Sequence, residues 1–248
     1  MNATPSTSSR HVLVTGASGR LGRAIALRLA QDGFHVTVHC HRKLDEALGV
    51  CEAIRTGGGC ADWIAFDVSD RDDAQSKLEA WVTAHGPFYG IVINAGITRD
   101  GAFPALSGED WDLVLGVGLD GFFNVVHPLI LPMIKTRKGG RIVCISSVSG
   151  VVGNRGQVNY SAAKAGLIGA AKALAVEVAS RGITVNCVAP GLIESELVDE
   201  TVLERALQAI PMDRVGQPED VAAAVGFLFS DGANYITRQV LGVNGGLV

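Results

Sequence analysis

HVLVTGASGRLGRAIALRLAQ, residues 11–31, contains a β-branched apolar run, a glycine-rich turn and an amphipathic segment, in that order. The run His11–Thr15 predicts a buried β-strand, and the apolar spacing of Leu21–Gln31 predicts a helix. Between them, three glycines spaced G-x-x-G-x-x-G allow a tight turn and let the backbone approach a pyrophosphate. The free N–H groups and the positive dipole end of the helix would then hold the phosphates. A glycine-rich turn alone is weak evidence, but its place between the first strand and a helix predicts dinucleotide binding.

The rest of the chain repeats this alternation of short β-branched runs and amphipathic segments. Strands are predicted at His11–Thr15, His35–His39, Trp63–Phe66, Gly90–Ile93, Arg141–Ser146, Thr184–Val188 and Gln239–Val243. Helices are predicted at Leu21–Gln31, Leu44–Arg55, Ala74–Ala84, Trp111–Ile134, Val158–Ser180, Thr201–Ala209 and Pro218–Phe229. This order predicts an α/β domain, and the nearly all-apolar strands indicate a parallel sheet covered on both faces by helices. An eight-fold (β/α) barrel is the competing fold, and the glycine-rich turn favours a doubly wound sheet instead.

Composition narrows the class of protein. No linker divides the chain, so residues 11–248 are predicted to form one domain. Residues 1–10 are predicted to form a flexible polar tail, which lacks the apolar segment of a secretory signal. The net charge of −4, from 21 Lys and Arg against 25 Asp and Glu, argues against a general nucleic-acid binder. Apolar runs such as Val221–Phe229 fall well short of the roughly 18 residues that span a bilayer, so no membrane association is expected. The odd number of cysteines, five, without a C-x-x-C pair favours a reduced, cytoplasmic protein.

The end of the second predicted strand bears on cofactor choice. An acidic residue there would hold the 2′-hydroxyl of NAD, but the sequence reads His39-Cys-His-Arg-Lys43, with no acid before Asp45. Arg42 is therefore expected to pair with the 2′-phosphate of NADP, with Arg20, His41 and Lys43 as possible helpers. The alternative is a solvated basic loop. A metal site at residues 39–41 is disfavoured, because alternation points neighbouring side chains to opposite faces of the sheet and no second pair of ligands is near.

A candidate catalytic pair opens the helix predicted at Val158–Ser180. Tyr160 and Lys164 stand four residues apart and share a helix face. An ammonium near a phenol lowers its pKa, and such a Tyr can donate a proton to a carbonyl oxygen or accept one from an alcohol. After the fifth strand, a hydroxyl of Ser146, Ser147 or Ser149 could bind the same oxygen, and spacing alone does not choose among them. A serine hydrolase is disfavoured, because G-x-S-x-G is absent and no His follows these serines.

Together these features resemble the short-chain dehydrogenase/reductase family over residues 11–248. The markers are the glycine-rich turn, Asp67-Val68, Asn94-Ala95-Gly96, Ser147, Tyr160-x-x-x-Lys164 and Pro190-Gly191. Within the family the chain is most similar to the β-ketoacyl-acyl-carrier-protein (ACP) reductases, through residues 94–100, 153–160, 180–186 and 243–246. The resemblance implies a single-domain Rossmann fold with a doubly wound, seven-stranded parallel sheet.

The resemblance also assigns roles to residues. It implies that Ser147 positions the substrate carbonyl, that Tyr160 donates the proton, and that Lys164 holds the nicotinamide ribose and lowers the Tyr pKa. It implies cofactor contacts from Gly16, Ser18, Gly19, Arg20, Leu21, Gly22, Arg42, Asp67, Val68, Asn94, Ala95, Gly96, Pro190, Gly191, Ile193 and Ser195, besides Tyr160 and Lys164. No metal is expected. The segment Ile193–Met212 is expected to cover the substrate.

Two departures from the family pattern affect these expectations. Gly19-Arg20 is the reverse of the usual Arg-Gly order, so backbone strain is expected at Arg20, or a new approach of its side chain to the 2′-phosphate. Gly118 stands where the family has an Asn that supports the proton relay through its main-chain carbonyl. Because Gly keeps that carbonyl, a slower or altered relay is expected, not a dead enzyme. Asn124, two turns further on, is interpreted as structural.

The function expected from the resemblance is NADPH-dependent reduction of a 3-oxoacyl-ACP thioester to the 3-hydroxyacyl thioester, in fatty-acid or related polyene or polyketide synthesis. The alternatives are a family member acting on another carbonyl or alcohol, and a catalytically weak nucleotide-binding scaffold. A homotetramer is implied. The basic residues Lys135, Arg137, Lys138 and Arg181 are a candidate docking patch for acidic ACP, and their alternative role is to stabilise helix C-termini.

Overall fold

The computed structural model describes residues 10–194 and 207–248, which contain a sheet of seven parallel strands. The strands are β1 (His11–Val14), β2 (His35–Cys40), β3 (Cys60–Ala65), β4 (Gly90–Ile93), β5 (Gly140–Ile145), β6 (Ile183–Pro190) and β7 (Val240–Val243). Their order is β3-β2-β1-β4-β5-β6-β7, and every neighbouring pair is parallel. The doubly wound, seven-stranded sheet expected from the sequence is therefore confirmed. The order reverses at β1, which pairs with both β2 and β4, and open α/β sheets bind ligands at such a point.

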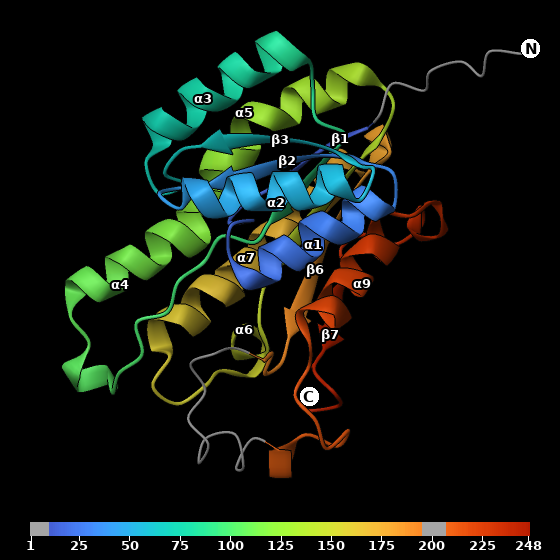
Figure 1. Ribbon diagram of the computed structural model, residues 1–248. Helices are drawn as coiled ribbons and strands as arrows, with labels where there is room; N and C mark the ends of the chain where they lie inside the picture. The colour runs from blue at the N-terminus through green and yellow to red at the C-terminus, as the bar shows by residue number, and fades with distance from the viewer. Residues whose placement is uncertain (1–9, 195–206) are drawn as a thin grey trace, which may run out of the picture.

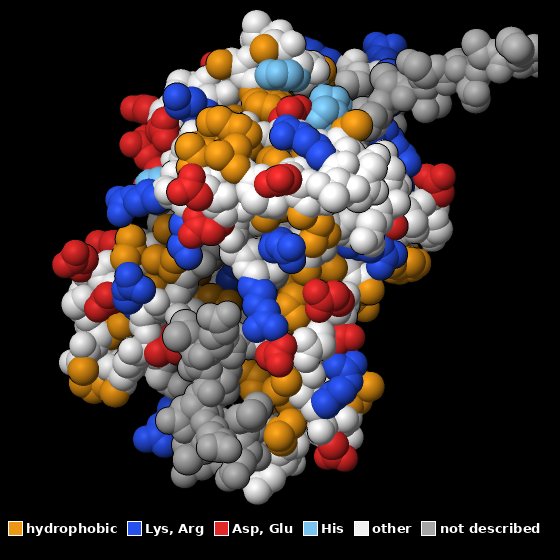
Figure 2. All heavy atoms as spheres, in the orientation of Figure 1, with side chains coloured by type: hydrophobic (Ala, Val, Ile, Leu, Met, Phe, Trp, Pro, Cys, Tyr) orange, Lys and Arg blue, Asp and Glu red, His pale blue; other side chains and the backbone are white. Residues whose placement is uncertain are grey.

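Helices cover both faces of the sheet, as the apolar strands predict. One core forms under α1 (Arg20–Gln31), α2 (Leu44–Thr56) and α9 (Pro218–Phe229). The other forms under α3 (Arg71–His85), α5 (Gly121–Thr136) and α7 (Val158–Val178). In Figure 1 the part of the sheet around β2 and β3 is seen nearly edge-on, with α3 and α5 above it and α1 and α2 below. On the face shown in Figure 2, acidic and basic side chains are interspersed, in keeping with the small net charge.

The single helix expected at Trp111–Ile134 is longer and interrupted. It consists of α4 (Gly108–Leu115), one π-helical turn (Gly116–Asp120) and α5. By length and composition alone the run Gly108–Thr136 could cross a membrane, a test that core helices also pass. Here α5 packs against α3, and its Val125, Leu129 and Met133 are buried in the second core. We therefore interpret this run as part of the α/β domain.

Some expected elements lie wholly or partly outside the described residues: the tail before Arg10, most of the helix at residues 201–209 and most of the covering segment Ile193–Met212. One short helix, α6 (Val148–Val152), was not expected from the sequence. It follows β5 directly and lies next to α7. Its position matters because the catalytic candidates stand at the starts of these two helices.

Candidate active site

A cavity of about 600 Å³ opens at the carboxyl ends of the central strands. It brings together most of the residues expected from the sequence: Gly16, Gly19, Arg20, Leu21, Gly22, Asn94, Ala95, Gly96, Ser147, Tyr160, Lys164, Pro190, Gly191 and Ile193. Ser18, Arg42, Asp67 and Val68 do not line it, and Ser195 lies outside the described residues. The glycine-rich turn and the Ser-Tyr-Lys candidates, more than 120 residues apart in the sequence, thus share one pocket.

The glycine-rich turn is shaped for a phosphate group. Gly16 has a φ of +64°, and a Cβ at Gly22 would stand 2.5 Å from the Gly16 carbonyl oxygen, so both positions require glycine. α1 begins at Arg20 without a side-chain cap at Gly19 and without an acidic residue in its first turn. Uncapped N–H groups at the positive end of a helix attract an anion. This part of the cavity therefore fits the pyrophosphate of a dinucleotide.

Hydrogen bonds between the ends of β1 and β4 hold the turn in place. The buried Thr15 hydroxyl donates to the Val92 carbonyl at 3.2 Å and accepts from the backbone N–H groups of Asn94 and Ala95 at 2.9 and 3.0 Å. The Asn94 side-chain amide donates to the carbonyls of Thr15 and Gly16 at 2.9 and 3.3 Å. Asn94, which was expected to contact the cofactor, thus also holds the glycine-rich turn in place.

Of the three candidate serines, Ser147 is the one whose hydroxyl is near enough to the Tyr160 phenol to influence its pKa. Ser147 is the N-cap of α6, and its oxygen also accepts from the N–H of Ser149 at 3.1 Å. The hydroxyl of Ser146 donates to the Lys164 carbonyl, and that of Ser149 donates to the Gln157 side chain. The structure therefore pairs Ser147 with Tyr160, a choice that the spacing left open.

Lys164 lies beneath Tyr160, one turn further along α7. Its side chain is 3% exposed, its Nζ donates to the Ile145 carbonyl at 2.8 Å, and it stands 5.6 Å from the centre of the Tyr160 ring. Burial lowers the pKa of this ammonium to about 8, because desolvation penalises its charged form. The nearby Cys144 and Cys187 act against this shift.

The pKa of Tyr160 moves in the direction opposite to the one expected. Burial raises it, the nearby Ser147 hydroxyl lowers it, and the negative charge of Asp100 raises it further. The expected lowering of this pKa by Lys164 is therefore not seen, since desolvation outweighs the other influences. A raised pKa keeps the phenol protonated at neutral pH, which suits a proton donor.

Known proteins resemble this chain over nearly its whole length. A family model described as enoyl-(acyl carrier protein) reductase matches residues 16–248. The chain is 60% identical over 240 residues to the 3-oxoacyl-[acyl-carrier-protein] reductase FabG of Aggregatibacter actinomycetemcomitans, with 96% of this chain and 99% of that protein covered. It is 44% identical over 241 residues to the protein of the same name from Thermotoga maritima (95% and 96% covered), and 43% identical over 242 residues to that from Staphylococcus aureus (96% and 98%).

The chain belongs to the short-chain dehydrogenase/reductase family. Enzymes of this family use a nicotinamide dinucleotide, and the glycine-rich turn described above fits one.

A second group of expected residues lies beside the cavity, after β2 and β3. His41 Nε2 stands 3.6 Å from Asp67 Oδ2. Burial acts to raise the pKa of Asp67, but hydrogen bonds from the Ser69 hydroxyl and N–H, with the nearby His41 and Arg42, lower it overall. Arg42 itself is exposed. Val68 is buried, and its carbonyl accepts from the Asn124 side chain at 2.9 Å, which confirms the structural interpretation of Asn124.

The reversed Gly19-Arg20 pair does not strain the backbone, so the expected strain is wrong. Gly19 has a φ of −84°, and Arg20 begins α1. Among the described residues, Arg20 is not one of the non-glycine residues with positive φ. Its guanidinium donates to the Glu194 carboxylate at 2.6 Å. Arg20 lines the cavity and its side chain pairs with Glu194, and its expected approach to a 2′-phosphate stays a prediction.

Gly118 lies in the π-helical turn and is buried against α7. A Cβ at this position would approach the Cβ of Ala163 to 3.2 Å, one residue before Lys164. π-Helical turns are frequent at functional sites. The close packing gives a physical reason for a small residue here, and the effect of Gly118 on proton transfer stays a prediction.

His39 is a site residue that the sequence analysis did not identify. Its ring is 2% exposed, and its Nδ1 accepts from the Gly16 N–H at 3.0 Å. Because Nδ1 is the acceptor, Nε2 carries the proton and donates to the Phe66 carbonyl at 3.0 Å. The neutral imidazole of His39 thus links the glycine-rich turn to the carboxyl ends of β2 and β3. The available signal was a titratable residue at the carboxyl end of a strand whose other residues are mostly buried.

We expect His39 to make folding sensitive to acid. Burial lowers its pKa from 6.5 to about 4, so on acidification the unfolded chain takes up this proton first. Stability that is present above pH 6.5 is lost as the pH falls toward 4, by about 3 kcal/mol for this group. His39→Gln should remove this part of the pH dependence, as measured by denaturant unfolding at pH 7 and about pH 4.5. The exposed His127→Gln is the control, and equal pH dependence in all three proteins would contradict the assignment.

Proposed function

We propose that the protein reduces the ketone of a 3-oxoacyl thioester carried on ACP, using NADPH. The observation that carries the proposal is the single cavity lined by the glycine-rich turn, Ser147, Tyr160 and Lys164. The matching family model is named for reduction of a carbon–carbon double bond, whereas the relatives that match over whole chains are named for reduction of a ketone. Two adjacent hydroxyl groups, on Ser147 and Tyr160, suit a carbonyl oxygen as their common acceptor.

When bound, NADPH would supply the hydride that reduces the ketone. The Ser147 hydroxyl donates a hydrogen bond to the ketone oxygen and stabilises the negative charge that develops on it. Tyr160 gives this oxygen its proton, since its raised pKa keeps the phenol protonated. The Lys164 ammonium stabilises the phenolate that forms, and its Nζ is held in place by the Ile145 carbonyl.

The test compares substrates at fixed NADPH. A 3-oxobutyryl group on ACP should be reduced, a crotonyl (enoyl) group on ACP should not, and a free ketone should be a poor substrate. Loss of the reduced-nicotinamide absorbance reports the rate. Reduction of crotonyl-ACP alone would contradict the proposal, and reduction of free ketones alone would favour the second candidate, a carbonyl reductase acting on another substrate. A scaffold would bind NADPH without any turnover.

Arg42 supports NADPH over NADH as the cofactor. It is exposed at the end of β2, where the chain has no acidic residue to hold a 2′-hydroxyl. We expect Arg42→Ala to raise KM for NADPH about ten- to hundred-fold, the worth of a charge-assisted hydrogen bond to phosphate, and to leave KM for NADH nearly unchanged. Arg155→Ala, which removes another exposed Arg, is the control. Equal losses with both cofactors would show that Arg42 does not contact the 2′-phosphate.

The proposal also includes an ACP docking patch and a homotetramer in the cytoplasm. Arg137, Lys138 and Arg181 line one cavity at the amino ends of the strands, whereas Lys135 stands outside its lining. Because the active-site cavity lies at the opposite ends of the strands, a carrier docked on this patch would have to serve the active site of a neighbouring subunit. The docking patch therefore depends on the oligomer, and light scattering with sedimentation would test that oligomer first.

A further inference from the structure

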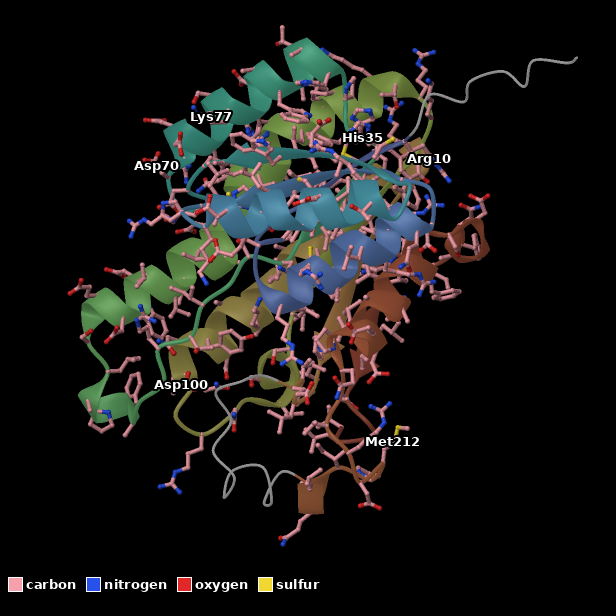
Figure 3. The ribbon with its side chains drawn as sticks, viewed as in Figure 1. Arg10, His35, Asp70, Lys77, Asp100 and Met212 are labelled. Carbon is pink, nitrogen blue, oxygen red and sulfur yellow. The ribbon has the colours of Figure 1, made fainter. Side chains whose placement is uncertain are left out.

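A second cavity, of about 670 Å³, lies at the amino ends of the strands, on the far side of the sheet from the active site. Its lining comes from the segments that lead into β1, β4, β5 and β6, together with Asp231 and Asn234 before β7. Arg10 lines this cavity, and Asp100 lies near Tyr160 of the active site. Figure 3 shows that these two residues lie toward opposite ends of the molecule. The chemical step proposed above uses none of this cavity's volume, although Arg137, Lys138 and Arg181 of its lining also belong to the proposed ACP docking patch.

The lining is strongly basic. It contains five Arg and Lys side chains and a single carboxylate: Arg10, Arg137, Lys138, Arg141 and Arg181 against Asp231. Asp231 is largely exposed and stands 3.9 Å from Arg10, the long end of the range for an ion pair. This excess of positive charge contrasts with the net negative charge of the whole chain.

Arg141 is the unusual member, because it is buried without a negative partner. It is 4% exposed, and its guanidinium donates to the Gly140 carbonyl and to the side-chain oxygen of Asn234. Its Nε has no hydrogen-bond partner, and among residues 10–194 and 207–248 no carboxylate forms an ion pair with it. A buried charge that is left unpaired is costly, so an anion near this guanidinium would be stabilised.

Helix C-termini explain part of this charge. α3 ends at His85 and α5 at Thr136, both at the cavity, and cations are favourable at the negative end of a helix. Arg137 and Lys138 fit that role. Arg141 does not, because it lies on β5 and its acceptors are the Gly140 carbonyl and Asn234.

We propose that this cavity is a binding site for a phosphorylated small molecule. The phosphate would lie against Arg141, with the more exposed Arg10, Arg137, Lys138 and Arg181 around it. Pro87, Phe88 and Tyr89 form an apolar part of the lining that suits the organic portion of such a ligand. The volume is in the range of small-molecule sites and exceeds the size of a single phosphate. This inference does not depend on the identity of the reduced substrate.

The test is calorimetric titration of pyrophosphate into the full-length protein saturated with NADPH, which keeps the probe out of the cofactor site. Ionic strength is held constant, so that general screening does not change. We expect saturable binding with one pyrophosphate per chain. Arg10→Gln and Arg181→Gln should each weaken it about five-fold or more, and Arg141→Met should abolish it.

Lys77→Gln is the matched control, because Lys77 is an exposed cation on α3 outside the cavity lining. Circular dichroism at each step checks that Arg141→Met folds; if it does not, the two exposed arginine variants decide. Absence of saturable binding, or equal affinity in the wild type, Arg10→Gln and Arg181→Gln, would overturn the proposal. Binding that is seen in a parallel titration without NADPH, but not with saturating NADPH, would assign the pyrophosphate to the cofactor site and would overturn the proposal as well.

Discussion

Tyr160→Phe should lower kcat for reduction of the thioester about a thousand-fold and leave the affinity for NADPH within about two-fold. General acid catalysis by a positioned side chain contributes on the order of 10² to 10⁴ in rate, and Tyr160 is the one phenol among the described residues that line the cavity. Among the described residues, Ser147 is the one whose hydroxyl is found to interact with the phenol, so loss of the phenol hydroxyl should not unfold the chain. The readouts are single-turnover reduction and fluorescence titration of NADPH.

Ser147→Ala is the matched variant, because it removes the other hydroxyl but retains the acid. We expect a loss of about 10² to 10³, the effect of removing one donor to a developing oxyanion, with the proton still supplied by Tyr160. The double variant should lose little more than Tyr160→Phe alone, since the two hydroxyls act on one oxygen. A Tyr160→Phe protein with more than about a tenth of the wild-type rate would show that another group supplies the proton.

Apolar runs in the sequence were sufficient to predict all seven strands, but not all of their bounds. The run expected at Trp63–Phe66 begins three residues earlier, at Cys60. β3 is an edge strand of the sheet, and of its first three residues only Ala61 is buried, while Asp62 is hydrogen-bonded to His35 at 2.7 Å. A polar residue that has a hydrogen-bond partner on the neighbouring strand interrupts the apolar pattern of the sequence, but it does not end the strand.

The starts of α2, α7 and α9 were predicted correctly, but the start of α3 was missed for a related reason. α3 begins at Arg71, three residues before the expected Ala74, because Asp70 caps it by accepting from the N–H groups of Asp72 and Asp73. The first turn of α3 is polar, so the spacing of apolar residues in the sequence does not show where the helix begins. The π-helical turn at Gly116–Asp120 has no such periodic signal either, and its Gly118 packs so closely that an added Cβ would stand 3.2 Å from the Cβ of Ala163.

At the site, the sequence predicted which residue types meet but not their electrostatics. The i, i+4 spacing of Tyr160 and Lys164 is correct for one helix face, yet it suggested a lowered phenol pKa. Burial of both groups is a property of the packed domain, and it raises the pKa of Tyr160 and lowers that of Lys164. His39 was missed for the same reason, because its two hydrogen bonds join segments that are distant in the sequence.

The glycine-rich turn allows the second large prediction. A Cβ at Gly22 would stand 2.5 Å from the Gly16 carbonyl oxygen, 2.7 Å from the Asn94 amide nitrogen and 2.8 Å from the Ala17 Cα. Two of these neighbours are backbone atoms of the turn, and the third holds the turn to β4 through its own hydrogen bonds. None of them can yield without moving the turn. We therefore expect Gly22→Ala to lower the affinity for NADPH about a hundred-fold and the free energy of unfolding by about 2–3 kcal/mol.

Gly49→Ala separates this steric effect from the general effect of alanine in a helix. Gly49 lies in α2, and a Cβ added there would meet no atom within 4 Å, so alanine should leave NADPH binding unchanged and raise stability by up to about 1 kcal/mol. Denaturant unfolding and NADPH titration of both variants measure the two quantities separately. If Gly22→Ala bound NADPH like the wild type, the turn would have to move without cost, and the tight approach of α1 to β4 would not be what shapes the phosphate site.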